Sequence, residues 1–369
     1  MYKQLLLMKK KILLTMLAAA VLASCSRTEL PAVGGGECTL TARLDVPPTR
    51  VESQTLANEK NIRNVQVFVF RAGPGGDAGV LEIAASAGFD RPLDRAEGFF
   101  NDITVKCSSG LREVWAVVND ARDRTSGADA VRTKREFLAI VHDLESSAPA
   151  QLLMIGRSNP DGPDPAVLLP EGPVEVFVPV HRLAAAVVLE SVKNDFSSPA
   201  YQRAGSFRLD AAYLINVPGR IDFGESLTAG TLDGQYWYAQ LAAERSGPRA
   251  SLLYDDLGGA PLEYGSVYER RHTFYAYPND CGPSGDPLFS PRATMLVLEA
   301  SVKYPEGWTR FYYPVLLEGG LLSNKRYHVN LTVHRPGSRD PNEPVSFLDL
   351  TPVVTVSDWD DGETYNAEI

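Results

Sequence analysis

The histidines are the side chains of this sequence best suited to acid–base catalysis or to metal binding. There are five of them: His142, His181, His272, His328 and His334. No two stand at the i, i+4 spacing that places two ligands on one face of a helix. The sequence also lacks the H-E-x-x-H, G-x-S-x-G, G-x-x-x-x-G-K-S/T and G-x-G-x-x-G motifs. We therefore expect no catalytic residue, no metal site and no cofactor.

Acidic residues gather near the C-terminal end, at Asp358, Asp360 and Asp361. Two carboxylates hydrolyse glycosidic bonds when they are held at the right separation. The same residues suggest calcium, but they lack the alternating oxygen ligands of an EF-hand loop. A charged run beside a strand end is typical of a solvated loop, and we assign it no chemistry. The four tryptophans are expected in the core or at interfaces: Trp115, Trp237, Trp308 and Trp359.

The first 24 residues have the pattern of a secretory signal. Three lysines at positions 9–11 precede an apolar run over residues 12–22, which is too short to span a bilayer permanently. The run ends at Leu22-Ala23-Ser24-Cys25, which resembles the bacterial lipoprotein box. This predicts a signal peptide over residues 1–24 and a lipid on Cys25. An ordinary secretory signal with an incidental cysteine is the alternative, and either Met1 or Met8 is the start.

The charge of the chain argues against nucleic acid as a partner. The formal net charge is −10, from 36 Lys+Arg and 46 Asp+Glu. Four lysines lie in residues 1–24, so the processed chain has 32 basic residues and a net charge of −14. Because affinity for nucleic acid depends on Lys and Arg contacts to phosphates, such an acidic surface disfavours it.

Three cysteines remain after the lipid site: Cys38, Cys107 and Cys281. Their spacing matches no zinc pattern such as paired C-x-x-C. Four cysteines in a chain of 369 residues do not make a disulfide framework. We expect Cys107 and Cys281 to be small buried apolar residues, as free cysteines usually are.

The strand signals begin directly after a polar tether. Cys38, Leu40, Ala42, Leu44 and Val46 alternate with polar residues, which is typical of a half-buried strand. Further short segments, rich in Val, Tyr, Phe and Thr, are separated by Gly, Pro, Asn and Asp clusters. They are residues 65–70, 103–107, 112–118, 174–180, 185–192, 206–215, 273–277, 294–302, 309–316, 326–334 and 353–359. The sequence therefore predicts a mainly β protein.

One segment, residues 133–144, has a helical period, with Phe137, Ile140, Val141 and Leu144 on one face. No alternation of strands and helices supports a Rossmann or TIM architecture. A domain boundary fits near residue 181, between the predicted strands 174–180 and 185–192.

Four stretches allow a comparison with a known family. They are the Cys25 box with the strand that precedes Arg50, residues 106–112 leading into 114–119, residues 180–185, and a tail made of residues 312–315, 324–333, 336–337, 340–345 and 354–359. In this order they resemble the FimA-type major fimbrillins, the subunits of the type V pili of Bacteroidia. The matches span nearly the whole processed chain.

The resemblance implies a fold, a division of the chain and a location. The fold is two stacked, transthyretin-like antiparallel β-sandwich domains. The division is a lipoprotein signal peptide over residues 1–24, a lipidated propeptide with the first strand over 25–50, an N-terminal domain over 51–180 and a C-terminal domain with the donor tail over 181–369. The lipidated precursor belongs to the outer membrane, and the mature subunit to a cell-surface fimbria that supports adhesion.

The resemblance also implies a route of assembly by strand exchange. In this family an Arg-specific protease of gingipain type cuts after an arginine in the loop that follows the first strand. Arg50, before Val51, stands where that cut would fall, and Arg43 is the alternative. The first strand then leaves, and the C-terminal strand of another fimbrial subunit fills the groove, which is β-augmentation.

The tail offers apolar residues with the alternation that a donor strand needs. They are Val354, Val356, Tyr365, Ala367 and Ile369. If this strand completes its own sheet instead, the subunit would be a terminal or anchor component. Two further hypotheses stay open: a lipid-retained tip adhesin, and a surface glycan-binding lipoprotein or β-sandwich hydrolase unrelated to pili.

Overall fold

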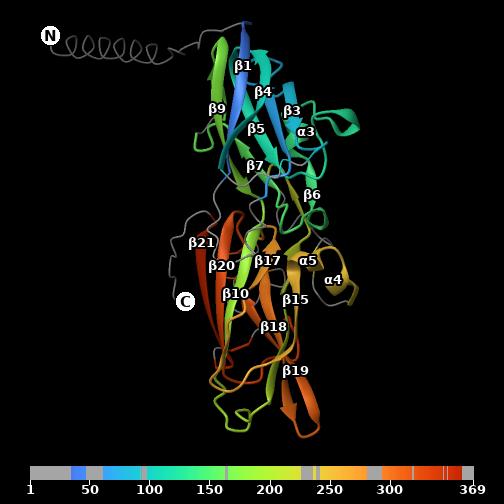
Figure 1. Cartoon of the computed structure of the whole chain (residues 1–369), viewed down its shortest axis with the longest axis vertical. Coiled ribbons are helices and arrows are strands. Elements are labelled where there is room, and N and C mark those ends of the chain that lie inside the picture. Colours follow the sequence, from blue (N-terminus) through green and yellow to red (C-terminus); the bar gives the residue numbers. More distant parts are fainter. Residues whose placement is uncertain are drawn as a thin grey trace, which may run out of the picture.

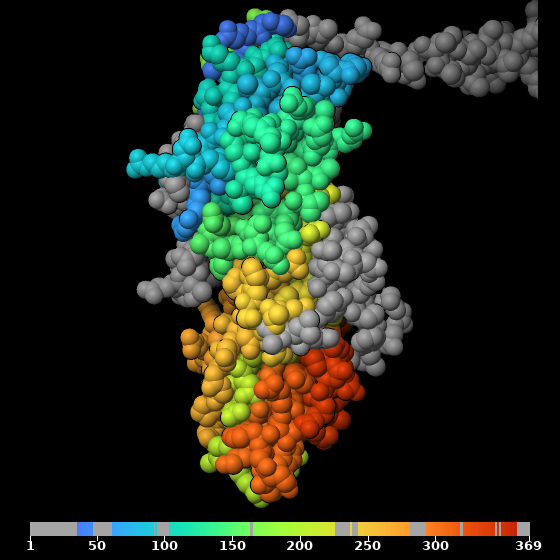
Figure 2. Space-filling view, turned by 90° about the vertical axis from the view of Figure 1, so that its right-hand side faces the viewer, coloured from blue at the N-terminus to red at the C-terminus, as the bar shows by residue number. Residues whose placement is uncertain are grey.

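A computed structural model of the chain describes residues 35–46, 61–91, 93, 98–162, 165–225, 236–237, 242–280, 293–317, 320–343, 345–346 and 348–359. The molecule is elongated and consists of two lobes stacked end to end (Figure 1). Figure 2 shows the first lobe, in blue and green, above the second, in yellow-green to red. Strands dominate both lobes, so the prediction of a mainly β fold is confirmed.

The first lobe is one strongly curved sheet of eight strands. Along the sheet the order is β3-β2-β5-β7-β9-β1-β4, and β8 pairs with β5. The curvature brings the two edge strands, β3 and β4, into contact. The backbone N–H of Ser108 on β4 donates a hydrogen bond to the side chain of Glu82 on β3 at 2.6 Å. The strands are β1 (Glu37–Val46), β2 (Val65–Arg71), β3 (Leu81–Ala87), β4 (Gly98–Ser108), β5 (Gly110–Val118), β7 (Met154–Arg157), β8 (Val167–Leu169) and β9 (Gly172–Arg182).

The second lobe is formed mainly by two sheets. One has the order β16-β10-β20-β21, with β17 also on β10, and the other has the order β15-β11-β18-β19. The strands are β10 (Ala185–Asn194), β11 (Phe207–Ile215), β15 (Tyr254–Pro261), β16 (Val267–Tyr268), β17 (His272–Ala276), β18 (Met295–Tyr304), β19 (Gly307–Leu316), β20 (Lys325–Val333) and β21 (Leu350–Asp358). Alternating apolar residues of these strands supply the core.

Short elements fill the junction between the lobes. Strand β6 (Val141–Asp143), from the first part of the chain, pairs with β13 (Arg220–Asp222) from the second. Strand β12 (Val217–Pro218) pairs with β14 (Tyr236–Trp237) beside it. The helices among the described residues are η2 (Gly127–Asp129), α3 (Lys134–Leu138), η3 (Leu144–Ser146), α4 (Ala242–Ser246) and α5 (Ala250–Leu253). Among the described residues, no helix is long and apolar enough to cross a membrane.

The helix predicted over residues 133–144 is much shorter in the structure. Thr133 caps α3 by accepting a hydrogen bond from the N–H of Glu136, but the helix ends at Leu138. The following backbone hydrogen-bonds to the second lobe instead, because the N–H of Phe223 donates to Ile140 at 3.0 Å and β6 pairs with β13. Two of the residues predicted on the apolar face, Phe137 and Leu144, are fully buried. Val141, predicted on the same face, is 47% exposed.

Two apolar clusters make up the core. One lies within the first lobe and includes Leu44, Val69 and Val178. The other begins with Phe68 and Phe137 in the first lobe and continues through the second lobe as far as Trp359. At the junction the rings of Phe137 and Phe223 are 5.4 Å apart. The second cluster is therefore continuous across the two lobes, whereas the first is confined to one lobe.

Candidate functional site

Strand β1 is the first described element of the chain and lies in the interior of a sheet. It pairs antiparallel with β4 from Glu37 to Val46 and parallel with β9 from Cys38 to Asp45. Figure 1 shows it beside β9 and β4 in the first lobe. Consequently both backbone edges of β1 are hydrogen-bonded, and its loss would leave β4 and β9 without a partner on the facing side.

The inward face of β1 is completely covered. The five predicted inward residues are 0–1% exposed, and all belong to the core of the first lobe: Cys38, Leu40, Ala42, Leu44 and Val46. Sequence alternation therefore predicted this strand and its buried face correctly. A segment at the start of the described chain is therefore an integral part of the core of this lobe.

The outward face of β1 carries polar contacts to both neighbouring strands. Glu37 accepts an ion pair from Lys106 at 2.5 Å, and Arg43 lies 3.7 Å from Glu175. The hydroxyls of Thr41 and Thr104 are 3.1 Å apart. These side chains are exposed to solvent, so they contribute little to stability. Apolar burial and the two backbone ladders hold β1 in place.

The second lobe contains a strand in the same arrangement as β1. Strand β10 pairs parallel with β20 and antiparallel with β17, as β1 pairs with β9 and β4. Both strands begin the sheets of their lobe. The difference is connectivity, because β10 continues from β9 after a two-residue gap, whereas β1 is joined to the rest of its lobe only through residues 47–64. A single cut in the chain after β1 would therefore break its backbone connection to the rest of the first lobe.

Two of the predicted donor residues lie in β21, the last described strand. Val354 pairs with Val329 and Val356 with Tyr327, so β21 lies along β20 in its own lobe. Among the described strands, β21 is an edge strand, since β20 is its only partner in the sheet. The remaining residues of the predicted maturation and donor segments, and one predicted buried cysteine, lie outside the described residues: Cys25, Arg50, Val51, Cys281, Tyr365, Ala367 and Ile369.

The structure brings together two cysteines that sequence analysis treated separately. Cys38 and Cys107 are direct partners in the register of β1 and β4. Both are free and buried in the structure. The prediction that Cys107 is buried is confirmed. The pairing was missed because nothing in the sequence gives the register between two strands 69 positions apart.

The five histidines are spread over the molecule and have different partners. His142 Nδ1 lies 2.6 Å from the Tyr277 hydroxyl, and His181 Nε2 lies 2.8 Å from Glu225. His272 and His328 contact Asp255 and Glu190, each at 2.7 Å. In the part of the chain that the structure describes, no group of three His, Cys, Asp or Glu residues is placed to hold a metal ion.

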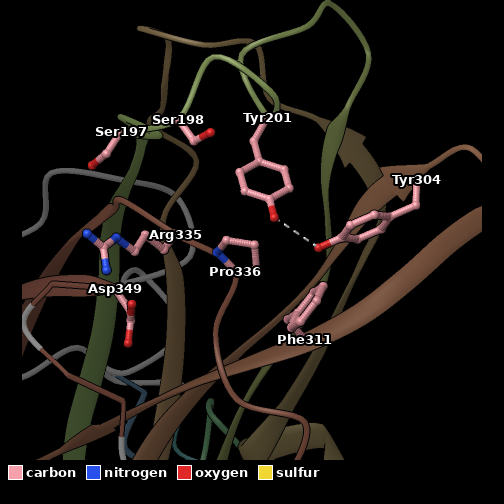
Figure 3. Close-up of a pocket in the computed structure, with 8 residues that line it drawn as sticks. All are labelled: Ser197, Ser198, Tyr201, Tyr304, Phe311, Arg335, Pro336 and Asp349. Atoms are coloured by element: carbon pink, nitrogen blue, oxygen red, sulfur yellow. Dashed lines mark hydrogen bonds between the residues drawn. The ribbon is translucent and has the colours of Figure 1, made fainter.

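A hollow of about 570 Å³ lies in the second lobe, beside the hairpin of β18 and β19 (Figure 3). Tyr201 and Tyr304 line it, and their hydroxyls are 3.5 Å apart. Phe311 lies below them in the view, and Arg335 and Asp349 lie across from them. Among its described lining residues Asp349 is the only carboxylate, so they do not supply the carboxylate pair that glycoside hydrolysis needs.

Three of the four tryptophans lie in the core, in agreement with the expectation of a core or interface position. Trp115, Trp237 and Trp359 are buried, whereas Trp308 is 41% exposed, and for it an interface position stays a prediction. The guanidinium of Arg208 covers the Trp308 ring at 4.4 Å. Near the C-terminal acidic run, Asp358 is paired with Lys325, and Asp360 and Asp361 lie outside the described residues.

Comparison with known proteins supports the fold assignment. No known family model matches the chain, and no curated protein matches it. Among solved structures, a putative cell adhesion protein from Bacteroides eggerthii has a TM-score of 0.60 at 19% identity, covering 88% of this chain and 96% of that one. The fimbrilin FimA from Porphyromonas gingivalis has a TM-score of 0.59 at 17% identity, covering 88% and 98%.

A putative cell adhesion protein from Parabacteroides distasonis has a TM-score of 0.57 at 15% identity, covering 88% of this chain and 99% of that one. All three likenesses extend over nearly the full length of the solved chains. The chain therefore has a FimA-type fimbrillin-like fold, in agreement with the resemblance found in the sequence.

Proposed function

We propose that this protein is a structural subunit of a cell-surface fimbria that supports adhesion. It is exported as a lipoprotein with the acyl chains on Cys25, is cleaved between Arg50 and Val51, and polymerises by donor-strand exchange. Its partners are other fimbrial subunits and an Arg-specific protease. The precursor is held at the outer membrane by its lipid, and the subunit carries out no catalytic step of its own.

The observation that carries this proposal is the position of β1. A strand at the start of the described chain occupies the interior of a sheet and buries five side chains. A cut within residues 47–60 would leave β1 without a backbone connection to its lobe. A strand that is removable in this way, between two partners that stay, is what strand exchange requires.

The cost of losing β1 explains why the groove must be filled again. Leu40, Leu44 and Val46 are 0–1% exposed, and burying such a side chain stabilises by roughly 1.5–3 kcal/mol. The three together contribute about 5–9 kcal/mol, before the hydrogen bonds to β4 and β9 are counted. An empty groove of this kind exposes apolar surface and unpaired backbone groups, which favours pairing with another chain.

A strand from a second copy, filling the groove of the first, makes a head-to-tail contact. Such a contact builds a filament if it does not close into a ring. In this proposal the donor comes from the end of the chain, where Val354 and Val356 begin the arm and Tyr365, Ala367 and Ile369 alternate with polar residues at its end. Because β21 is an edge strand among those described, it can separate from its sheet by losing only one strand partner.

The position of Arg43 supports cleavage at Arg50. Arg43 pairs with Phe177 in the ladder between β1 and β9, and a protease needs an extended segment that is free of such pairing. We expect Arg50→Ala to block maturation and filament formation, and Arg43→Ala, the matched control, to leave both unchanged. The assay is the mass of the N-terminus in subunits sheared from the cell surface. A chain that starts at Val51 in the Arg50→Ala variant, or normal filaments without cleavage, would contradict the proposal.

The pairing of β21 with β20 favours a second candidate, a lipid-retained anchor or tip adhesin subunit. All nine residues of β21 pair with β20 in the same lobe, as they would in a subunit that donates no strand. The two candidates differ at Cys25. Acyl chains that persist on Cys25 in assembled fimbriae would identify the anchor or tip subunit, whereas their absence, with a start at Val51, would identify the polymerising subunit.

A further inference from the structure

We propose that Cys38 and Cys107 form a disulfide that ties β1 to β4 in the precursor. The bond would act as a redox latch on the first strand. The disulfide is inferred from the structure alone, and its role as a latch rests on the proposed release of β1 during assembly.

The register places the two thiols opposite each other. Cys38 and Cys107 are Cα partners in the antiparallel ladder of β1 and β4. The N–H of Ser109 donates to the carbonyl of Gly36 at 2.9 Å, so residues 36 and 109 form a hydrogen-bonded pair. Because such pairs alternate along the ladder, Cys38 and Cys107 form the next one. The Cα separation at this kind of pair is about 5.5 Å, within the range of roughly 4.4–6.8 Å found for disulfides.

The thiols lie among mostly apolar side chains, with the charged Glu82 and Arg112 near Cys107. Cys38 is 0% exposed and Cys107 is 8% exposed, and both belong to the core cluster of the first lobe. Burial, together with the neighbouring Cys38 thiol, raises the pKa of Cys107 to about 12. Since the thiolate is the species that attacks a disulfide, the packed thiols exchange slowly with other thiols.

The bond is made or broken most easily where the strand can open. Cys38 is the second residue of β1, so separation of the first residues of the strand is enough to expose it. Strand ends open locally at a smaller cost in free energy than the centre of a sheet. The latch can therefore be set during folding and released later without unfolding of the lobe.

The reaction is an ordinary thiol–disulfide exchange. The oxidant is the disulfide of a thiol oxidoreductase in an oxidising compartment outside the cytoplasm. One thiolate attacks that disulfide, the mixed disulfide is resolved by the second cysteine, and the S–S bond forms. Cys38 and Cys107 lose two protons and two electrons together, and the oxidoreductase gains them as two thiols.

The consequence concerns the fate of β1 after cleavage. Without the bond, the cut segment is held only by packing and hydrogen bonds. With the bond, it stays attached to Cys107 until an external thiol reduces the disulfide. Cleavage and strand release then become two separate steps, and the second depends on the supply of reductant.

The first test is peptide mapping of the full chain, isolated from the envelope of cells that produce it. Free thiols are blocked with N-ethylmaleimide before digestion with trypsin. Cleavage at Arg27, Arg43, Lys106 and Arg112 gives the peptides 28–43 and 107–112, each with one cysteine. We expect a linked peptide that separates on reduction. Maleimide on both cysteines in the unreduced sample would overturn the proposal.

The second test measures release of β1 from a chain with a site-specific protease sequence inserted between Arg50 and Val51. After the cut, we expect the N-terminal fragment to leave the unmodified chain only when reductant is present. The variant Cys38→Ala/Cys107→Ala should release it without reductant. In that background, Thr41→Cys/Thr104→Cys should restore the requirement. Thr41 and Thr104 are register partners in the same ladder, and their hydroxyls are 3.1 Å apart.

The outcomes separate the latch from the proposed function. Equal release from the unmodified chain with and without reductant would refute the latch. Retention of the fragment by Cys38→Ala/Cys107→Ala in both conditions would contradict strand release, and hence the proposed function. In that case the peptide map alone decides whether the disulfide exists.

Discussion

Leu44 allows a sharp test of whether β1 leaves the subunit. Its side chain is 0% exposed in the core of the first lobe, so Leu44→Ala should cost about 3 kcal/mol in the precursor. For a unit of this size, that corresponds to a fall in Tm of roughly 6–12 °C. If assembly removes β1, the assembled filament no longer contains residue 44. The same substitution should then leave the stability of the filament unchanged.

Leu169 on β8 provides the matched control. It is 1% exposed, belongs to the same cluster and remains in the subunit after cleavage. Leu169→Ala should therefore lower the stability of precursor and filament alike. Calorimetry of the uncleaved precursor and heat dissociation of filaments, followed by light scattering, give the two readouts. If Leu44→Ala weakens the filament as much as Leu169→Ala does, β1 is retained and the reasoning is wrong.

Two further predictions concern the junction between the lobes. Burial lowers the pKa of His142 below its ordinary value of 6.5, so the unfolded chain binds a proton there that the folded chain does not. The free energy of unfolding should therefore fall as the pH decreases below 6.5. His142→Asn should make the free energy of unfolding, measured by urea titration, less dependent on pH. An equal pH dependence in the unmodified protein and the variant would contradict this prediction. A Cβ on Gly156 would lie 2.0 Å from the Pro179 carbonyl, so Gly156→Ala should lower stability by about 1–3 kcal/mol. Gly76 has open space around it, so Gly76→Ala, the control, should leave the Tm in a thermal scan unchanged. Equal Tm values for the two variants would show that the predicted collision at Gly156 does not occur.

The sequence predicted best those strands in which large apolar side chains alternate or cluster. β1, β11 and β20 lie close to their expected positions, because their core-facing residues are apolar and their ends are polar. β3 was missed because it has mostly small residues and is half-buried throughout. β15 was missed because Gly258 and Gly259, both with φ +67°, make a strand segment resemble a loop.

The candidate site was predictable in part for the same reason. The alternation from Cys38 to Val46 showed which face of β1 is buried, but no local pattern shows which strands lie beside it. Its parallel pairing with β9 joins residues more than 130 positions apart, and only the fold reveals it. The true length of α3 depends likewise on β13, which takes over the hydrogen bonds of the segment after it.

The junction between the lobes has a mechanical consequence. A load along the long axis passes through the β6–β13 ladder, the packed rings of Phe137 and Phe223 and the ion pair between Asp143 and Arg249, which are 3.1 Å apart. These links cross from one lobe to the other at several points, so we expect the two lobes to resist hinging and to move as one rigid unit. In a filament assembled as proposed, bending and stretching are therefore concentrated in the exchanged strands between subunits, and the compliance of the fibre is set by the donor segment.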